Sequence, residues 1–319
     1  MRSQRVSRPA EVTKLVDDEV GWPAHEEVNR CADYDERVTP RGMSLHPATG
    51  VSGTDGDGFM PVKSADRVLT ILELLAARRR WYSLSEISQE LGIPLSSLHG
   101  ILRTMQRRGW LAVDETNTRF GIGVQALLVG SSYPRSDPLV ARADPVLDWL
   151  SETTGETVHY GRIEGAHIVY LAKRESRYQL RIYTPVGKRI PVHATSLGKA
   201  ILAQHPDEEA RKILDWPLER LTPHTLATPE ALFADLAAIR ERGCAIEMEE
   251  SDVGLGCVAV TVPGQAALSD AISITAPTVR LDPERVRQLA SLLASARRML
   301  EGQVSVPAEA LPGGFLRNL

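Results

Sequence analysis

The sequence has little cysteine, which limits the classes of protein to which it can belong. Its three cysteines, Cys31, Cys244 and Cys257, form no Cys-x-x-Cys pair and no disulfide framework. A disulfide-stapled secreted domain is therefore excluded, and the cysteine usage fits a reducing compartment. His159 and His193 have no metal-ligand spacing to these cysteines, so we expect hydrogen-bonded histidines, no metal site and no cofactor.

The chain also lacks a long apolar run. No stretch approaches the roughly 18 apolar residues of a membrane span, and the first residues contain no apolar core of the signal-peptide kind. We therefore expect a cytoplasmic protein that makes no membrane contact. Hydrophobic residues make up 43% of the 319 residues, which is enough for a core in each of about two domains.

The chain has no overall excess of positive charge, but its positive charge is unevenly distributed. The formal net charge is −4, yet residues 62–123 contain 9 Lys and Arg against 6 Asp and Glu. Residues 1–61 contain 7 against 11, and residues 124–319 contain 21 against 24. A basic segment of this size fits either nucleic-acid binding or a solvated helix face, and charge alone does not decide between them.

Residues 62–123 show the order of a winged helix-turn-helix domain. A first helix begins near Ser64, and a capping box from Ser83 to Glu86 starts a second helix that ends at Gly92. A tight turn and a third helix follow, and Gly109 ends that helix. Two short strand-like runs around a polar turn at residues 116–118 predict a hairpin wing.

The third helix has one apolar face and one polar face. Leu98, Ile101, Leu102 and Met105 fall at helical spacing and predict the buried side. In a winged helix-turn-helix domain this helix enters the DNA major groove, and its first half reaches base edges. The candidate DNA-binding residues are Ser96, Ser97, His99, Gly100 and Arg103 for the groove, Arg107 and Arg108 for phosphates, and Arg119 on the wing.

Gly100 is unusual in this helix because glycine in a helix interior costs roughly 1 kcal/mol relative to alanine. Two explanations remain open at this point. Close approach of the helix backbone to DNA requires a residue without a side chain, and so does a tight helix–helix contact inside the domain.

The remainder of the chain alternates strand-like runs with helices, which predicts an α+β domain over residues 143–302. We expect residues 124–142 to form a linker helix. Residues 1–61, rich in charge, glycine and proline, and residues 303–319 are expected to be disordered. A translation start at Met43 or Met60 is an alternative for the first segment.

Several stretches, in order, resemble the IclR family of bacterial transcriptional regulators. They are SADRVLTILELLA, LSEISQELGIPLSSLHGILRTMQRRGWL, PVLDWLSETTGETVHYGRIEGAHIVYLAKRES, GKRIPVHATSLGKAILA and GCAIEMEESDVGLGCVAVTVPG followed by ALSDAISITAP. The resemblance implies double-stranded DNA as a partner, assembly as a homodimer or homotetramer, and no catalysis. It also implies a C-terminal GAF-like domain that binds a small-molecule effector, commonly a carboxylate or aromatic acid.

By position in these motifs, the resemblance implies an effector site at Ser196, Leu197, Gly198, Glu247, Leu255, Cys257, Ser273 and Thr275. A helix N-terminus and hydroxyl side chains suit an anion. Three departures stand out. Ser97 replaces a threonine and Gly100 an arginine that are frequent in the recognition helix, and Leu197 replaces a small residue. Glu247 either repels a carboxylate or, when protonated, donates to it.

An enzyme is the alternative class. It would be a small-molecule-binding or hydrolytic α+β enzyme whose N-terminal helices only mediate dimerisation. The hairpin wing and the arginines of the third helix argue against it, and the surroundings of Ser196 do not match a Gly-x-Ser-x-Gly nucleophile motif.

Overall fold

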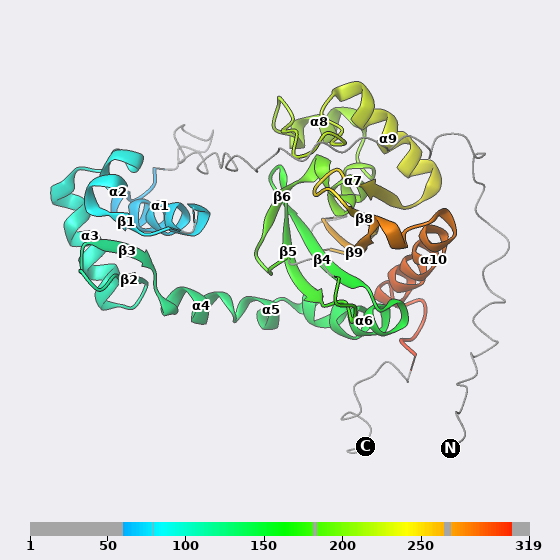
Figure 1. Cartoon of the computed structure of the whole chain (residues 1–319), viewed down its shortest axis with the longest axis horizontal. Coiled ribbons are helices and arrows are strands. Elements are labelled where there is room, and N and C mark those ends of the chain that lie inside the picture. The colour runs from blue at the N-terminus through cyan, green and yellow to red at the C-terminus, as the bar shows by residue number, and fades with distance from the viewer. Residues whose placement is uncertain (1–59, 79, 181–183, 265–268, 308–319) are drawn as a thin grey trace, which may run out of the picture. The chain divides into compact units, whose positions relative to one another are not determined.

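The computed structural model describes residues 60–78, 80–180, 184–264 and 269–307, and it divides into two compact units at Tyr133 and Pro134 (Figure 1). Most of both expected disordered tails, residues 1–59 and 308–319, lies outside the described residues. Residues 303–307 are described, and Val306 packs against a core. The chain therefore stays ordered beyond Gly302, where the sequence predicted disorder.

The N-terminal unit is a winged helix-turn-helix, as the sequence predicted. A three-stranded antiparallel sheet in the order β1-β3-β2 joins three helices around one core, in which Ile71, Ile87 and Leu98 are fully buried. The elements are α1 (Lys63–Arg78), β1 (Tyr82–Ser83), α2 (Leu84–Leu91), α3 (Leu95–Arg107), β2 (Leu111–Val113) and β3 (Arg119–Ile122).

Local signals set the ends of α2. The Ser83 hydroxyl accepts a hydrogen bond from the Glu86 N–H at 3.2 Å, and the Glu86 carboxylate accepts one from the Ser83 N–H at 2.7 Å. Gly92 then takes a left-handed φ of 63°. The two-residue strand β1 was not predicted, because its only signal is pairing with β3.

The segment after the wing does not form the single linker helix predicted over residues 124–142. It contains α4 (Val124–Gly130), α5 (Tyr133–Ser136) and the start of α6 (Pro138–Thr154). A new helix starts at Pro138 because the Asp137 side chain caps it by accepting hydrogen bonds from the Leu139 and Val140 N–H groups.

The C-terminal unit is built on a six-stranded antiparallel sheet in the order β6-β5-β4-β9-β8-β7. The predicted helices and strands are present, so the α+β class is confirmed. Strands β6 and β7 and helix α8 are additional. The elements are β4 (Thr157–Glu164), β5 (His167–Arg174), β6 (Arg189–Pro191), η2 (Val192–Ala194), α7 (Ser196–Leu202), α8 (Asp207–Ile213), α9 (Pro229–Arg242), β7 (Ala245–Met248), β8 (Leu255–Val262), β9 (Asp270–Pro277), η3 (Thr278–Arg280) and α10 (Pro283–Leu300).

The two faces of this sheet differ in chemistry. One face carries large apolar side chains such as Tyr160, Val258 and Ile274, which pack against α6 and α10. The other face, which we call the α7 face, lies under α7 (Figure 1). Cross-strand pairing puts small and polar residues there, namely Ala245, Glu247, Cys257, Ala259, Ser273 and Thr275.

Helix α7 is seated by a close backbone contact. All of its residues are buried, and a Cβ atom added to Gly198 would lie 2.1 Å from the Val192 carbonyl oxygen. Only glycine allows this approach between α7 and η2. The position of α7 above the sheet therefore depends on Gly198.

A buried ion network ties the start of α6 to the sheet. Arg162 on β4 donates to Asp270 at 2.8 and 2.6 Å and to Asp137 at 2.5 Å. The Arg162 side chain is 12% exposed, and both carboxylates are more deeply buried. Removal of one partner of such a network leaves an uncompensated buried charge.

We expect Gly198→Ala to lower the free energy of unfolding of the C-terminal unit by at least about 2 kcal/mol, because the new methyl group overlaps backbone atoms. Gly100→Ala is a matched control: nothing among the described residues lies within 4 Å of its Cβ position. It should gain up to about 1 kcal/mol from helix propensity. Urea denaturation followed by circular dichroism measures both changes, and equal effects would contradict the packing argument.

Candidate DNA interface and effector site

Helix α3 buries one side and exposes the other, as the sequence predicted. Leu98, Leu102 and Met105 are buried, whereas Ile101 is only half-buried. The helix ends at Arg107, and Arg108 is its C-cap. The exposed positions include Ser96, Ser97, His99, Gly100, Arg103, Arg107 and Arg108.

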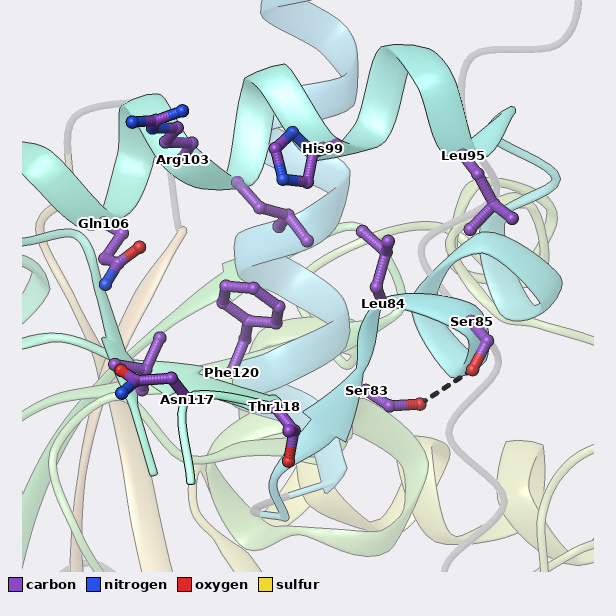
Figure 2. Close-up of a pocket in the computed structure, with 12 residues that line it drawn as sticks. Ser83, Leu84, Ser85, Leu95, His99, Arg103, Gln106, Asn117, Thr118 and Phe120 are labelled. Atoms are coloured by element: carbon purple, nitrogen blue, oxygen red, sulfur yellow. Dashed lines mark hydrogen bonds between the residues drawn. The ribbon is translucent and has the colours of Figure 1, made fainter. Parts of the chain in front are cut away.

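An open groove of about 600 Å³ runs between α3, the start of α2 and the wing. Figure 2 shows His99, Arg103 and Gln106 on the α3 side, with Asn117 and Phe120 opposite them. The other lining residues are Ser83, Leu84, Ser85, Leu95, Leu102, Val113 and Thr118. The groove therefore joins hydrogen-bonding groups of the helix and the wing over an apolar floor.

The sequence analysis missed Gln106 and the wing residues Asn117 and Thr118. Gln106 was detectable, because it follows His99 and Arg103 at helical spacing along one edge of α3. Asn117 and Thr118 were not detectable, because their position depends on how the hairpin folds back against α3.

Arg119 is not among the residues that line this groove, and its contact with DNA stays a prediction. Phe120, the neighbour of Arg119 in β3, lines the groove. The Arg119 side chain therefore points to the opposite face of the small sheet. There its guanidinium donates to the Trp81 carbonyl at 3.2 Å and to Glu86 at 3.4 Å. Adjacent strand residues point to opposite faces, and the alternation in β3 puts Phe120 next to α3.

The turn of the wing is acidic. Residues 114–118 contain Asp114 and Glu115 and no lysine or arginine. Asp114 holds the turn by accepting hydrogen bonds from the N–H groups of Thr118 and Arg119 at 2.9 and 3.0 Å. The tip of the wing therefore repels phosphate groups rather than attracting them.

The surroundings of Gly100 decide between the two explanations for this glycine. Nothing in the described part of the chain lies within 4 Å of a Cβ atom added at this position. A tight helix–helix contact inside the domain is therefore excluded. Gly100 instead leaves open space on the exposed side of α3.

The residues expected to bind an effector come together in the C-terminal unit. Glu247 on β7 pairs with Cys257 on β8, and Cys257 pairs with Thr275 on β9. These three residues form one row across the α7 face, and Ser273 and Leu255 lie on the same face. Helix α7, which begins with Ser196, Leu197 and Gly198, packs on this face, and Leu197 belongs to the apolar core between the helix and the sheet.

Hydrogen bonds connect this row to His159 of β4, whose partner in the sheet register is Ser273. The sequence predicted only a hydrogen-bonded histidine at this position. The Cys257 thiol donates to the Thr275 hydroxyl at 3.2 Å, and that hydroxyl lies 3.3 Å from His159 Nδ1. The ring of Tyr170 meets the His159 ring edge-on at 4.8 Å. Burial lowers the pKa of His159 to about 3, so the imidazole is neutral at pH 7.

Burial also acts on the two cysteines that the structure describes. Cys244 and Cys257 are free thiols, and burial raises the pKa of both. Cys31 lies outside the described residues. His193 Nε2 donates a hydrogen bond to the Glu219 carbonyl oxygen at 2.8 Å. In the described ranges, no three His, Cys, Asp or Glu residues converge as a metal site would require.

Glu247 is fully buried at the other end of the row. Its Oε1 accepts hydrogen bonds from the Glu250 and Ser251 N–H groups at 2.5 and 3.1 Å. Its Oε2 has no hydrogen-bond partner among the described residues. Burial, reinforced by the charge of Glu250, raises the pKa of Glu247 to about 7.

Lys199 anchors the segment next to Glu247. It is fully buried on α7 and forms ion pairs with Asp235 on α9 at 2.7 Å and with Glu250 at 2.6 Å. It also donates to the Ile246 carbonyl at 3.2 Å. These contacts hold α7, α9 and the segment that follows β7 in one arrangement.

One N–H group at the N-terminus of α7, where the sequence predicted an anion site, is bound within the fold. The Gly198 N–H donates to the side chain of Thr195, which caps the helix, at 3.0 Å. Leu197 packs as a core residue, because a Cβ atom on Gly161 would lie 3.0 Å from its Cδ1 atom.

Comparison with known proteins identifies the two units. The model of the bacterial transcriptional regulator IclR C-terminal matches residues 132–300, and that of the IclR helix-turn-helix domain matches residues 64–115. The chain belongs to the IclR family. It is thus a transcriptional regulator with a DNA-binding helix-turn-helix and an effector domain.

Curated relatives support this membership over most of the chain. The HTH-type transcriptional regulator BhcR of Paracoccus denitrificans is 34% identical over 268 residues, covering 83% of this chain and 94% of its own. The transcriptional repressor IclR of Escherichia coli is 33% identical over 263 residues, covering 81% and 94%.

Solved structures share the fold. A transcriptional regulator from Rhodococcus sp. RHA1 has a TM-score of 0.65 at 27% identity and covers 76% of this chain and 98% of its own. An IclR homolog from Microbacterium hydrocarbonoxydans, complexed with 4-hydroxybenzoate, has a TM-score of 0.61 at 23% identity and covers 75% and 99%. None of the helices in the described part of this chain combines the length and apolar character of a transmembrane span.

We expect the wild-type chain to lose stability relative to Glu247→Gln as pH rises from 5 to 8. A carboxyl whose folded-state pKa of about 7 exceeds its ordinary 4.5 stabilises the fold below that ordinary value, and this contribution is lost as pH rises through 7. Urea unfolding at several pH values measures the difference. Glu152→Gln, at an exposed position on α6, controls for the loss of one negative charge. Parallel curves for wild type and Glu247→Gln would show that burial does not perturb this carboxyl.

Proposed function

We propose that this regulator binds operator DNA as a homodimer or homotetramer through α3 and responds to a small organic acid bound on the α7 face. Residues 62–123 supply the DNA-binding part, and the protein works in the cytoplasm by binding rather than by catalysis. The exposed polar side of α3, with two arginines aligned on it, is the observation that carries the proposal.

The contacts divide by position along α3. Arg103, halfway along the helix, reads a base edge, with Ser96, Ser97 and His99 beside it in the groove. Arg107 and Arg108 at the helix end neutralise phosphates. Gly100 leaves room for the helix backbone to approach the DNA closely.

The part of the proposal that concerns effector binding is argued from the polar row of the α7 face. Ser196, Glu247, Leu255, Cys257, Ser273 and Thr275 come from separate segments and meet at one place in the fold. Leu197 and Gly198 contribute by seating α7 rather than by touching ligand polar groups. The homolog complexed with 4-hydroxybenzoate supports an organic acid as the class of effector.

Self-association is proposed through α4. Val124, Leu127 and Leu128 of this helix are 66%, 68% and 59% exposed, which is high for apolar side chains in one short segment. A second copy of the chain is the occupant that we assign to this face. Two copies would then present two α3 helices to an approximately palindromic site.

Arg103→Ala should weaken binding to the selected operator by about 10–100-fold while leaving non-specific binding nearly unchanged, because it removes base contacts. Arg107→Ala should weaken binding to all sequences alike and lower the salt dependence by about one unit of slope. Arg119→Ala is the matched control, since its side chain is held on the far face of the wing. Fluorescence anisotropy at several salt concentrations measures all three. Equal losses for Arg103→Ala and Arg119→Ala would contradict the assigned surface.

The double variant Leu127→Ser, Leu128→Ser should weaken association between copies and reduce affinity for a palindromic operator more than for a single half-site. It removes apolar area that a partner covers. Sedimentation velocity and operator titration are the measurements. Leu180→Ser, at another leucine that is 63% exposed, is the control. Unchanged association in the double variant would remove α4 from the interface.

A further inference from the structure

The exposed side of α3 carries positive charge that no carboxylate of the described chain neutralises. No aspartate or glutamate occurs between Glu90 and Asp114 in the sequence. The guanidinium groups of Arg103, Arg107 and Arg108 form no ion pair with any described residue. These three cations therefore lack a counterion in the part of the chain that the structure describes.

Arginines elsewhere in the N-terminal unit differ in this respect. Arg78 pairs with Glu90 at 3.2 Å, and Arg80 and Arg119 pair with Glu86 at 2.8 and 3.4 Å. Both glutamates lie on α2. Carboxylates of α2 thus neutralise the arginines near them, whereas the arginines of α3 have no such neighbour in the described ranges.

The groove beside the α3 arginines has an apolar floor. Leu84, Leu95 and Phe120 line it, and Leu95 is 51% exposed (Figure 2). Its volume of about 600 Å³ admits an aromatic side chain, which buries roughly 150–250 Å² when it packs on such a floor. Phosphate groups cannot cover apolar area. The surface therefore fits an occupant that combines negative charge with an aromatic group.

The chain itself contains such an occupant before α1. Residues 11–36, which we call the acidic segment, contain 9 Asp and Glu against 2 Lys and Arg. Trp22 stands between two acidic runs, residues 17–19 and residues 26–27. The acidic segment lies outside the described residues and outside both family models, which match residues 64–115 and 132–300. It is therefore additional to the two units that the family models match.

Charge and reach both direct the acidic segment to the N-terminal unit. Residues 62–123 contain 9 Lys and Arg against 6 Asp and Glu, whereas residues 124–319 contain 21 against 24. The C-terminal unit therefore repels the acidic segment on average. The 37 residues between Trp22 and Met60 can span up to roughly 120 Å. Chain length thus does not prevent contact with α3.

We infer that the acidic segment docks on the exposed side of α3 when no DNA is bound. Its carboxylates pair with Arg103, Arg107 and Arg108, and Trp22 lies on the apolar floor of the groove. DNA and the acidic segment then compete for the same arginines, so the segment lowers the affinity for operator and non-operator DNA alike. This inference rests on the proposed role of α3 in DNA binding.

A weak contact is sufficient because the acidic segment belongs to the same chain. Covalent linkage keeps it near α3 at an effective concentration on the order of 1 mM. A contact with a dissociation constant of about 0.1–1 mM then weakens DNA binding by about 2–10-fold.

Fluorescence anisotropy of a labelled duplex at low salt, with the full chain and its variants, tests the inference. Trp22→Ser leaves the charge unchanged and should tighten DNA binding about 2–5-fold, which is part of the full effect. Phe59→Ser, at an aromatic residue outside the acidic segment, is the matched control and should bind DNA as the wild-type chain does.

Two charge variants separate docking from simple repulsion between the chain and DNA. Asp17→Asn with Asp18→Asn should tighten DNA binding more than Asp55→Asn with Asp57→Asn, which removes the same charge closer to α1 in the sequence. Equal gains for the two pairs would show that repulsion alone explains the effect, and the docking inference would be wrong.

Cys31 lies in the acidic segment and gives a direct measure of docking. A fluorescent maleimide on Cys31 should lose anisotropy when unlabelled duplex is added, because DNA displaces the segment. Arg107→Ala should lower the anisotropy already in the absence of DNA. The Cys31→Ser chain, labelled in the same way, supplies the background from the other two thiols. Anisotropy that does not fall on addition of DNA would contradict displacement.

The same variants distinguish the possible failures. If Trp22→Ser binds DNA as the wild-type chain does while Arg103→Ala weakens operator binding, the docking inference is wrong and the DNA-binding surface stands. If neither variant changes DNA binding, the assignment of α3 fails as well. Inhibition that grows with protein concentration would assign the surface to a second copy of the chain, and docking within one chain would be overturned.

Discussion

The contact between Gly198 and the Val192 carbonyl is the constraint on which the effector half of this regulator depends. It allows α7 to lie directly on the sheet, and every residue of α7 is buried as a result. The fully buried Lys199 then joins α7 to α9 and to Glu250. Glu250 follows Glu247 closely enough that its N–H fixes one carboxylate oxygen of Glu247. A single close approach thus places the polar row of the α7 face in a dry, preorganised environment.

The sequence predicted most elements because their signals are local. The Ser83–Glu86 capping box and the stop of α2 at Gly92, for example, are both present in the structure. Strands β6 and β7 were missed because three or four residues carry too little alternation to separate them from loops.

Non-local pairing explains what the sequence left undetermined. The side on which Arg119 emerges depends on the alternation of β3 against α3, which no local pattern reveals. His159 belongs with Thr275, a residue 116 positions away along the chain, and only the β4–β9 register brings them together. The candidate effector residues came from family motifs. The structure brings those of β7, β8 and β9 together on the α7 face.

A second buried ion network connects the six-stranded sheet of the C-terminal unit to the segment that precedes α6. Asp137 caps α6 and pairs with Arg162, and Arg162 pairs with Asp270 at the start of the strand that carries Ser273 and Thr275. A ligand that shifts β9 or β4 therefore acts on the first residue before α6. The size of any response is limited by the difference in the ligand's affinity for the two arrangements.

Selection of bound sequences from a random double-stranded DNA pool, with and without 4-hydroxybenzoate at physiological salt, tests the central claim most directly. A ligand-responsive dimeric regulator enriches an inverted repeat, and the enrichment changes when the acid is present. Salt-sensitive binding without any enriched sequence, in both conditions, would contradict operator reading by α3.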